Sequence, residues 1–288
     1  MALIAVTGAS GFLGRQVVDE LLTNGHAVRG LDSQGRSPVP ERSEQQIVDL
    51  RDADAAHAAL VGCDGIVHLA GYPRVGVLPP EEVFTTNTAI TFSVVQAALD
   101  LGIGTLAYVS SVSVLGYPFF TQPITPESFP IDETANSIPQ DAYGLSKSVG
   151  EQIIDAAVAQ AGGAFAAVSL RMPWLQSPSS FWHDIPLSEA DGSDAKNLFA
   201  YLDTRDAATA IACVFAHARR GHVRVFVAAE DTFSTRPTAD LIAEYFPGVP
   251  VRKALPGTQS LIASSAARET LDWTPRWSWR GYRPGPDA

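Results

Sequence analysis

Cysteine is scarce in this sequence. Among 288 residues only Cys63 and Cys213 are cysteines, without CxxC spacing and without histidines at the intervals of a metal motif. The pattern excludes a fold built on a disulfide framework and contains no recognisable metal-binding motif. We expect both thiols to be buried and reduced, and we expect no metal.

Basic residues and long apolar runs are also in short supply. Lys and Arg number 20 against 31 Asp and Glu, which gives a net charge of -11. A nucleic-acid partner needs a basic face that this balance does not provide. No apolar run approaches the ~18 residues of a membrane span, and the run in MALIAVTGAS lacks the basic flank of a signal peptide. We therefore expect a cytoplasmic protein without nucleic-acid or membrane partners.

Short β-branched runs alternate with longer helical patterns, which is typical of βαβ units and a parallel sheet. Strands are expected at 3–8, 27–32, 45–50, 65–71, 105–111, 164–170 and 223–228. Helices are expected between the first two strands and at 53–60, 80–101, 142–161, 205–219, 238–246 and 264–271. The Pro-rich stretch 117–140 predicts a loop that lines a site. Beyond Pro173 the alternation weakens, and the Pro, Ser and Trp residues at 173–188 indicate a small, mostly discontinuous substrate-binding lobe.

Three glycines stand at GxxGxxG spacing between the first expected strand and the first expected helix: Gly8, Gly11 and Gly14. Glycine there lets backbone N–H groups approach a pyrophosphate, and the helix N-terminus adds partial positive charge. The next strand ends in Asp32, whose carboxylate suits ribose hydroxyls and repels a 2′-phosphate. The pattern favours NAD over NADP, while Arg29 and Arg36 leave NADP open because an arginine can pair with the extra phosphate.

Tyr143 and Lys147 are four residues apart in an expected helix, so their side chains project from one face, one turn apart. A phenol with a pKa near 10 is a poor base at neutral pH, and a neighbouring ammonium favours the phenolate. We interpret Tyr143 as a general acid/base and expect Lys147 to lower its pKa. The end of strand 105–111, where ligands of open α/β sheets bind, offers hydroxyls to orient the reacting group. The candidates are Ser110, Ser111 and Ser113.

Five ordered segments resemble one family. They are the glycine motif, VDL at 48–50, HLAG at 68–71, VSSVSVLG at 109–116 and YGLSKSVGE at 143–151. Together they resemble the extended short-chain dehydrogenase/reductase family, of the NAD-dependent epimerase/dehydratase type. The resemblance implies a Rossmann-like, doubly wound parallel α/β sheet over residues 1–172. It implies a small substrate-binding lobe over 173–288, from which 201–228 returns to the core.

The resemblance also implies roles for single residues. It selects Ser111 as the catalytic partner of Tyr143 and Lys147, and strand alternation puts Ser113 on the same side. The residues it places around NAD are Gly8, Ser10, Gly11, Phe12, Leu13, Gly14, Asp32, Asp49, Leu50, Leu69, Ala70, Gly71, Asn87, Tyr143, Lys147, Met172 and Pro173. Asn87 stays open to a second interpretation, as an ordinary polar residue of its helix.

The substrate end carries fewer signals. The residues expected around the substrate are Tyr72, Arg74, Ser111, Ser113, Trp174 and Tyr201, with Phe181, Trp182 and His183 as further candidates. Leu115 stands where sugar-nucleotide members of the family commonly carry Tyr. Leu198 and Phe199 stand where epimerases and dehydratases usually present an Arg that clamps a diphosphate. These departures favour a substrate smaller than a nucleotide sugar.

The sequence thus predicts an NAD-dependent oxidoreductase. It would transfer hydride between nicotinamide and a secondary alcohol or ketone of a sugar, sugar acid or similar small polyol. A sugar epimerase is the alternative within the family, because the same residues can return the hydride to the other face. A non-catalytic, dinucleotide-sensing protein is the alternative from another class. The resemblance further implies a homodimer built on the helices at 80–101 and 142–161.

Overall fold

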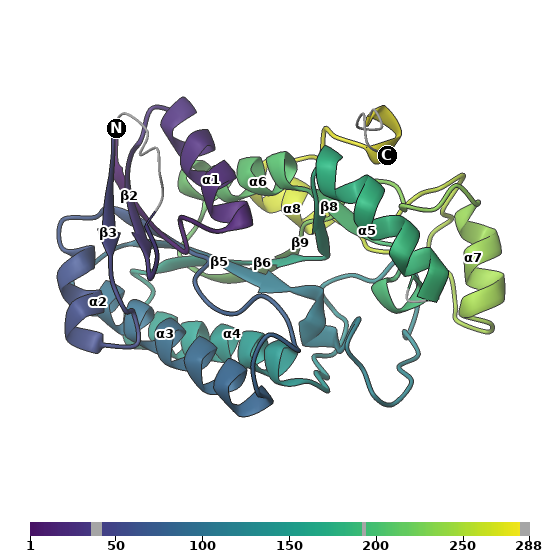
Figure 1. The fold of residues 1–288 in the computed structure, drawn as a ribbon, viewed down its shortest axis with the longest axis horizontal. Helices are drawn as coiled ribbons and strands as arrows, with labels where there is room; N and C mark the ends of the chain where they lie inside the picture. Colours follow the sequence, from purple (N-terminus) through teal and green to yellow (C-terminus); the bar gives the residue numbers. More distant parts are fainter. Residues whose placement is uncertain (36–41, 192–193, 283–288) are drawn as a thin grey trace.

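A seven-stranded sheet forms the centre of the computed structural model, which describes residues 1–35, 42–191 and 194–282 (Figure 1). The strands lie in the order β3-β2-β1-β4-β5-β6-β9, and all neighbours are parallel. Their bounds are β1 (Leu3–Thr7), β2 (Ala27–Asp32), β3 (Ser43–Ile47), β4 (Gly65–His68), β5 (Thr105–Ser111), β6 (Ala166–Met172) and β9 (Gly221–Phe226). The expected α/β class with a doubly wound parallel sheet is confirmed.

Helices cover both faces of the sheet (Figure 1). One face carries α2 (Ala53–Leu60), α3 (Pro80–Asp100) and α4 (Ala142–Gln160), and the other carries α1 (Phe12–Thr23), α6 (Thr204–His217) and α8 (Ser265–Leu271). In α1, Val17, Val18 and Leu21 recur at helical spacing and are buried against the sheet. Each face has its own apolar core. No helix in the described part of the chain combines the length and apolar character that a membrane span requires.

The carboxyl ends of the seven strands meet at one edge of the sheet, because all strands run the same way. The order of the strands reverses between β1 and β4: β2 and β3 lie outside β1, whereas β5, β6 and β9 lie outside β4. Ligands of open parallel sheets bind at such a switch point. The turns that follow β1, β2, β4, β5 and β6 therefore share one edge beside it.

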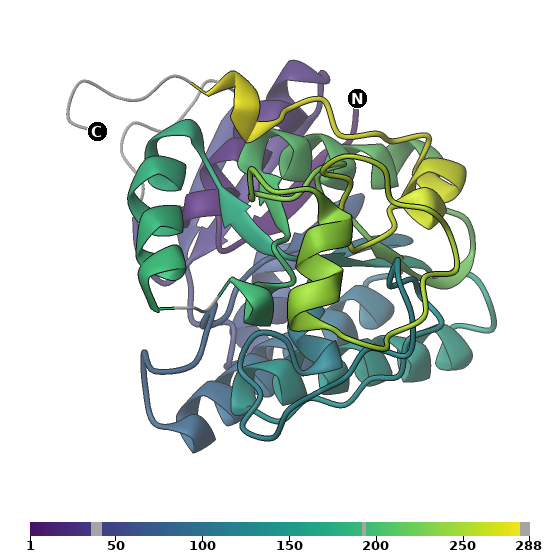
Figure 2. The same ribbon diagram turned by 90° about the vertical axis from the view of Figure 1, so that its right-hand side faces the viewer.

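The chain after Met172 builds a smaller region beyond the ends of β5 and β6, which faces the viewer in Figure 2. It contains β7 (Trp174–Gln176) paired with β8 (Tyr201–Asp203), α5 (Pro178–Asp191), α7 (Thr238–Tyr245) and the 3-10 turns η2 (Ala195–Asn197) and η3 (Trp279–Gly281). The sequence pattern at 173–188 does not predict the strand β7 and the helix α5. Helix α5 begins at Pro178, a residue that the first turn of a helix tolerates. The apolar residues of α5 recur only weakly at helical spacing, so the sequence pattern does not reveal this helix.

Aromatic rings form the core of this C-terminal region. Phe181 stacks on Trp279 with 5.1 Å between ring centroids, and it meets Tyr201 and Tyr282 at 5.9 and 5.5 Å in tilted, edge-on geometry. Such pairs stabilise a core beyond the apolar area that they bury.

Two buried aspartates at the start of α6 fasten the end of the chain. Asp203 accepts from the hydroxyl of Tyr282 at 2.5 Å. Asp206 accepts from the backbone N–H groups of Arg276 and Trp277, each at 2.9 Å. Both carboxylates have no exposed surface. Their hydrogen bonds join the C-terminal segment to α6, the helix that packs against α1.

Some boundaries differ from the expected ones. Strand β3 ends at Ile47 instead of residue 50, so Asp49 and Leu50 follow it in a turn. The stretch 117–140 has no helix or strand, as expected for a loop, and it is anchored through isolated bridges at Phe129 and Ile131.

Candidate active site

The glycine turn after β1 is shaped for close approach. Gly8 has φ of +71°, a region that favours glycine. A Cβ on Gly14 would lie 2.1 Å from the carbonyl oxygen of Gly8, so no larger residue fits there. Gly11 has no side chain to cap α1, and the first turn of α1 has no acidic residue. This open helix N-terminus fits a pyrophosphate group.

Phe12 and Leu13 continue this turn into α1. Phe12 is 57% exposed, whereas Leu13 is buried in the core between α1 and the sheet. Only the backbone of Leu13 is therefore available to a dinucleotide.

Asp32 ends β2 and faces the glycine turn. Its Oδ2 accepts from the N–H of Ser10 at 2.9 Å, and its Oδ1 accepts from the N–H of Gln34 at 3.1 Å. These bonds orient the carboxylate and leave each oxygen with a lone pair for a ribose hydroxyl. Asp32 thus fits the adenosine ribose of a dinucleotide.

Arg29 points away from this carboxylate. Its Nη1 donates to the carbonyl oxygens of Ala59 and Val61 at 3.0 and 2.7 Å, and its Nε pairs with Glu44. The guanidinium is thereby tied to the end of α2 and is not placed to meet a 2′-phosphate. Arg36, the other arginine that leaves NADP open, lies outside the described residues.

A buried hydrogen-bond chain fixes the end of β4. Thr7 Oγ1 accepts from the N–H groups of Leu69 and Ala70 at 3.1 and 3.0 Å, so its own proton goes to His68 Nδ1 at 2.8 Å. His68 Nε2 then donates to Thr91 Oγ1 at 3.1 Å. Burial lowers the pKa of His68 to about 3, which keeps the ring neutral. The chain holds Leu69 and Ala70 beside the glycine turn.

Asn87 shapes the loop that follows. Its Oδ1 accepts from the N–H of Tyr72 at 2.7 Å, and its Nδ2 donates to Tyr72 O and Ser146 Oγ, both at 3.1 Å. Gly71 has φ of +140°, and a Cβ there would lie 2.8 Å from Asn87 Oδ1. Both amide hydrogens of Asn87 are used within the protein. Asn87 therefore holds the loop in place and has no free N–H for a dinucleotide.

Asp49 and Leu50 lie in the turn after β3. Asp49 Oδ1 and Oδ2 accept from Arg51 Nε and Nη2 at 2.9 and 2.6 Å, and these bonds lower the pKa of Asp49 to about 2. Leu50 is 4% exposed and packs in the core below α2. At this turn the ion pair of Asp49 with Arg51 is the group open to solvent.

Lys147 lies against the end of β5, one turn after Tyr143 in α4. Its Nζ donates to the carbonyl oxygen of Val109 at 2.8 Å. The same atom lies over two rings, 5.0 Å from the centroid of Tyr108 and 5.8 Å from that of Tyr143. Tyr143 and Lys147 keep 8% and 7% of their surface exposed. Both groups are thus buried almost completely at the switch-point edge.

Ser111 completes this cluster. It ends β5 and caps η1 (Val112–Leu115): its Oγ accepts from the N–H of Ser113 at 3.1 Å and donates to Ser113 Oγ at 3.0 Å. Its register partner in β6 is Met172. The strand pairing therefore brings Ser111, the buried Met172 and the following Pro173 to the same edge. Ser110 points elsewhere and donates to Glu151 Oε1 at 2.7 Å.

The protonation of the cluster differs from the expectation. Burial raises the pKa of Tyr143 to about 12, although the Ser111 hydroxyl acts to lower it. Burial lowers the pKa of Lys147 to about 8, and the carboxylate of Glu151 opposes that change. The expected lowering of the Tyr143 pKa by Lys147 is not met, because the cost of ionising a buried phenol dominates. Tyr143 is thus a neutral phenol, ready to donate a proton.

Two glycines of α4 were not recognised from the sequence as site-forming residues. A Cβ on Gly144 would lie 2.4 Å from Ser113 O, and one on Gly150 would lie 2.2 Å from the hydroxyl oxygen of Tyr108. They allow α4 to approach β5 and η1 closely enough to bring Tyr143 to Ser111. The glycines in YGLSKSVGE carried this signal, since glycine inside a helix costs stability unless packing requires it.

The expected substrate residues divide into accessible and inaccessible ones. Tyr72 and Trp174 are partly exposed and Arg74 is exposed, so all three are accessible. Tyr201 is 1% exposed, its hydroxyl donates to Asp231 Oδ1 at 2.7 Å, and the same oxygen accepts from the N–H of Trp279 at 2.9 Å. The Tyr201 hydroxyl is therefore bonded within the protein, and its expected contact with the substrate stays a prediction.

The three further candidates and one ring that the sequence did not single out lie in different surroundings. Phe181 is buried in the aromatic core, and His183 lies on the surface beside Asp184. The ring of Trp182 packs on Phe181. Phe119, from the loop after η1, meets the ring of Tyr143 edge-on at 6.4 Å. Phe119 thus adds an apolar wall beside the phenol.

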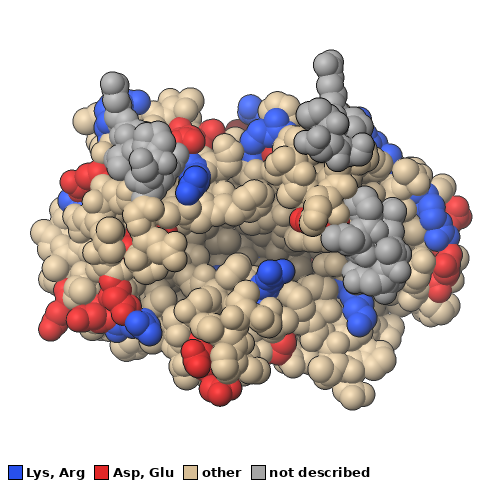
Figure 3. Space-filling view, viewed as in Figure 1, with Lys and Arg blue, Asp and Glu red and all other residues tan. Residues whose placement is uncertain are grey.

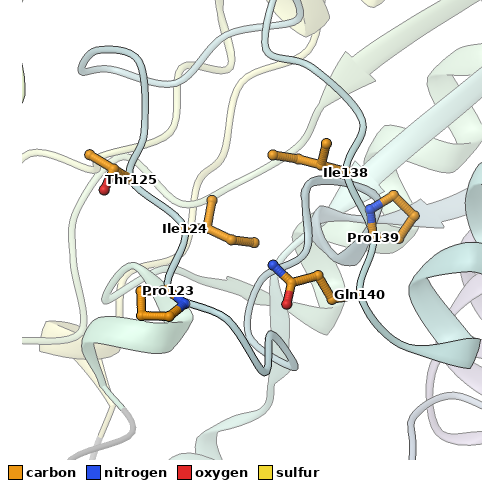
Figure 4. A pocket seen from close by; sticks show the side chains of 6 residues that line it. All are labelled: Pro123, Ile124, Thr125, Ile138, Pro139 and Gln140. Atoms are coloured by element: carbon orange, nitrogen blue, oxygen red, sulfur yellow. The ribbon is translucent and has the colours of Figure 1, made fainter.

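The face drawn in Figure 1 is hollowed across its middle, with basic groups at the rim (Figure 3). A separate pocket of 410 Å³ lies in the loop after η1, between Pro123–Thr125 and Ile138–Gln140 (Figure 4). The amide of Gln140 already bonds Thr121 and Gln122. This pocket contains none of the expected site residues, so we do not assign it a role in the chemistry. Among the described residues, no cluster of His, Cys, Asp and Glu could hold a metal.

The family comparison agrees with this geometry. The model described as the NAD dependent epimerase/dehydratase family matches residues 4–229. The chain belongs to this family.

Curated relatives within the epimerase/dehydratase family have different activities. Uronate dehydrogenase of Pseudomonas syringae pv. tomato is 35% identical over 152 residues, and the match spans 52% of each chain. L-arabinose 1-dehydrogenase (NAD(P)(+)) of Haloferax volcanii is 33% identical over 180 residues, 61% of this chain and 68% of that protein. UDP-glucose 4-epimerase of Streptomyces lividans is 25% identical over 97% of this chain and 96% of its own. The chain thus spans about half the length of the first of these relatives.

Solved structures of other proteins share this fold. A UDP-galactose 4-epimerase has a TM-score of 0.70 at 22% identity, covering 96% of this chain and 94% of its own. A mutated uronate dehydrogenase has the same TM-score and identity, covering 97% and 83%.

Proposed function

We propose that this protein is an NAD-dependent oxidoreductase acting on a sugar, sugar acid or similar small polyol. It transfers hydride between nicotinamide and a carbon that carries a secondary hydroxyl or carbonyl group. The observation that supports this most strongly is the buried cluster of Tyr143, Lys147 and Ser111, at the same sheet edge as the glycine turn. The activities of two family relatives, a uronate dehydrogenase and an L-arabinose dehydrogenase, point the same way.

The residues present fit NAD. The turn from Gly8 to Gly14 admits a pyrophosphate at the N-terminus of α1, and Asp32 suits the adenosine ribose. The engagement of Arg29 with α2 supports NAD over NADP. When bound, NAD supplies nicotinamide C4 as the acceptor or donor of hydride.

In the mechanism that we propose, Ser111 orients the reacting oxygen and Tyr143 moves its proton. Because burial keeps Tyr143 protonated, the phenol donates directly to a carbonyl oxygen during reduction. During oxidation it must first lose its proton, so that direction should accelerate as pH rises. The ammonium of Lys147, held on the carbonyl oxygen of Val109, stabilises the negative charge that then forms on the phenol oxygen.

We propose residues 173–288 as the substrate lobe, with 201–228 joined to the core. Leu198 and Phe199 are 0% and 3% exposed, so neither can meet a diphosphate. Lys196 lies over the ring of Phe120 at 5.5 Å, where it is a single cation without the two-pronged geometry of arginine. These features support a free sugar or sugar acid. The exposed Arg74 is accessible to bind the carboxylate of a sugar acid.

The test is a panel of uronates, L-arabinose and UDP-glucose, with NADH absorbance as the readout. We expect NADH with at least one free sugar or sugar acid and none with UDP-glucose. The second candidate, an epimerase, is favoured by the nearly full-length match to UDP-glucose 4-epimerase. It predicts conversion of UDP-glucose to UDP-galactose without net NADH. Binding of NAD without turnover of any panel member would indicate a dinucleotide-sensing protein instead.

Assembly and location complete the proposal. Phe92 of α3 and Leu145 of α4 are 58% and 44% exposed on two helices that pack together. This supports a homodimer formed by α3 and α4, which sedimentation analysis would detect. The two unpaired cysteines, Cys63 and Cys213, support a cytoplasmic location.

A further inference from the structure

Helix α4 turns a row of ionisable side chains toward the sheet. Tyr143, Lys147, Glu151 and Asp155 follow one another at intervals of four residues, so they form one stripe along the helix. Glu151 is 3% exposed and thus buried like Tyr143 and Lys147. The side chain of Asp155, by contrast, is 48% exposed. A buried carboxylate therefore lies one turn from the ammonium of Lys147.

The Glu151 carboxylate collects donors from three strands. Oε1 accepts from Ser110 Oγ of β5 at 2.7 Å and from Arg171 Nε of β6 at 3.0 Å. Oε2 accepts from Arg171 Nη2 at 2.7 Å and from Arg224 Nε of β9 at 2.8 Å. Ser110 directly precedes Ser111, and Arg171 directly precedes Met172. Glu151 thus ties α4 to β5 and β6 one residue behind the cluster that holds the reacting groups.

Titratable side chains from β4, β5 and α4 lie around Lys147, and most of them are neutral. Tyr108 of β5 and His68 of β4 are neutral neighbours, since burial raises the pKa of the former and lowers that of the latter. Tyr143 is neutral as well. Glu151 is the carboxylate that favours the ammonium form of Lys147 against the effect of burial.

The far end of this stripe is linked to Glu151 through Arg224, which bonds both carboxylates. Asp155 pairs with Arg224 and with His222 Nδ1 at 2.8 Å, and His222 Nε2 contacts Ser169 Oγ at 2.7 Å. Ser169 has no exposed surface, so this serine, histidine and aspartate cannot act on a substrate. The group provides matched controls for substitutions at Glu151.

We propose that Glu151 is a positioning residue for the reaction: it holds α4 at the ends of β5 and β6, so that its own carboxylate stays one turn from the Lys147 ammonium and Tyr143 stays opposite Ser111. The predicted effect of Glu151 on turnover rests on the proposed function. The effect on Lys147 is measurable in the protein without substrate.

The first experiment titrates the lysines directly. The sequence has three lysines, Lys147, Lys196 and Lys253, so [ε-¹³C]lysine labelling gives three NMR signals, and Lys147→Arg assigns the relevant one. In the wild type Lys147 should titrate near pH 8. Glu151→Gln should lower that midpoint by about one pH unit, because a nearby opposite charge is lost. Asp155→Asn, a matched change one turn further, should leave it in place. An unchanged midpoint in Glu151→Gln, or an equal shift in both variants, overturns the proposal.

The second experiment separates geometry from charge and does not depend on whether Glu151→Gln folds. Ser110→Ala removes one bond to Glu151 and no charge, and we expect kcat to fall roughly two- to tenfold with KM and the Lys147 midpoint unchanged. Ser169→Ala, an equally buried serine of β6, should keep the kcat of the wild type. Wild-type kcat in Ser110→Ala contradicts the positioning role. If the wild type turns over no substrate, the proposed function fails, while the lysine titration still decides the effect on Lys147.

Discussion

The dinucleotide-facing half and the C-terminal region of this protein are held together by different means. In the first half, parallel strand pairing and the close backbone contacts of Gly8, Gly14 and Gly144 set the geometry. In the second, side chains from distant segments do so, through the aromatic core around Phe181 and the buried acceptor Asp206. The comparison teaches that regular backbone pairing positions the proposed site, whereas side-chain contacts hold the C-terminal region. A tyrosine hydroxyl is the proposed proton donor in the first, and the Tyr201 hydroxyl bonds within the protein in the second.

The largest expected effect comes from Tyr143→Phe, which tests the reactive half. Removing the proton-carrying hydroxyl should lower kcat by roughly 10²–10⁴-fold, the usual contribution of a general acid/base. NAD affinity, measured by calorimetry, should remain within about threefold because the ring stays in place. Retention of more than about a tenth of wild-type kcat would remove Tyr143 from the mechanism.

Gly14→Ala should break the backbone geometry of the same half. A Cβ placed 2.1 Å from Gly8 O forces the glycine turn open, so we expect a loss of about 1–3 kcal/mol in the free energy of unfolding. NAD binding should fall below detection in a calorimetric titration. Gly104→Ala is the control, because a Cβ there meets no atom within 4 Å. Normal NAD affinity in Gly14→Ala would contradict the assignment of the dinucleotide site.

Tyr201→Phe is the counterpart of Tyr143→Phe in the C-terminal region. It removes the donor to Asp231 Oδ1 and the acceptor of the Trp279 N–H, while Asp231 Oδ2 keeps Ser278 and Arg280. Unfolding in urea should therefore become easier by about 1–3 kcal/mol. We expect KM and kcat at a temperature where the variant is folded to stay within about threefold of the wild type. A selective rise in KM with unchanged stability would instead place Tyr201 in the substrate site.

The smallest expected effect is a pH dependence in the C-terminal region. Burial raises the pKa of Asp206 from its ordinary value of 3.8 to about 6, so the folded state holds this proton more tightly than the unfolded chain. The resulting stabilisation is complete below the unfolded pKa and is lost as pH rises through about 6. The free energy of unfolding in urea should be measured for the wild type and for Asp206→Asn. Between about pH 4 and pH 7, the wild type should lose on the order of 1 kcal/mol of this free energy relative to the variant. A difference that does not vary with pH would exclude this ionisation from the stability of the region.

The same contrast explains what the sequence could predict. Local signals determine the first half: apolar runs predict the strands, the glycine spacing predicts the turn, and the Tyr143 and Lys147 spacing predicts a shared helix face. The role of Asn87 in holding the Tyr72 backbone depends on contacts across 15 positions, and the bond from Tyr201 to Asp231 spans 30. Local sequence patterns do not predict hydrogen bonds between residues so far apart in the chain. The raised pKa of Tyr143 was missed for a related reason, since burial depends on the whole fold.

The central claim is that Tyr143, Lys147 and Ser111 act on the oxygen of a substrate carbon that faces nicotinamide. It is tested most directly by deuterium transfer, with L-arabinose or a uronate labelled at the reacting carbon and NAD in a single turnover. The account predicts deuterium at nicotinamide C4 with the wild type and transfer at least about a hundredfold slower with Tyr143→Phe. Transfer at the wild-type rate by Tyr143→Phe, or no transfer from any substrate by a folded wild type that binds NAD, would contradict it.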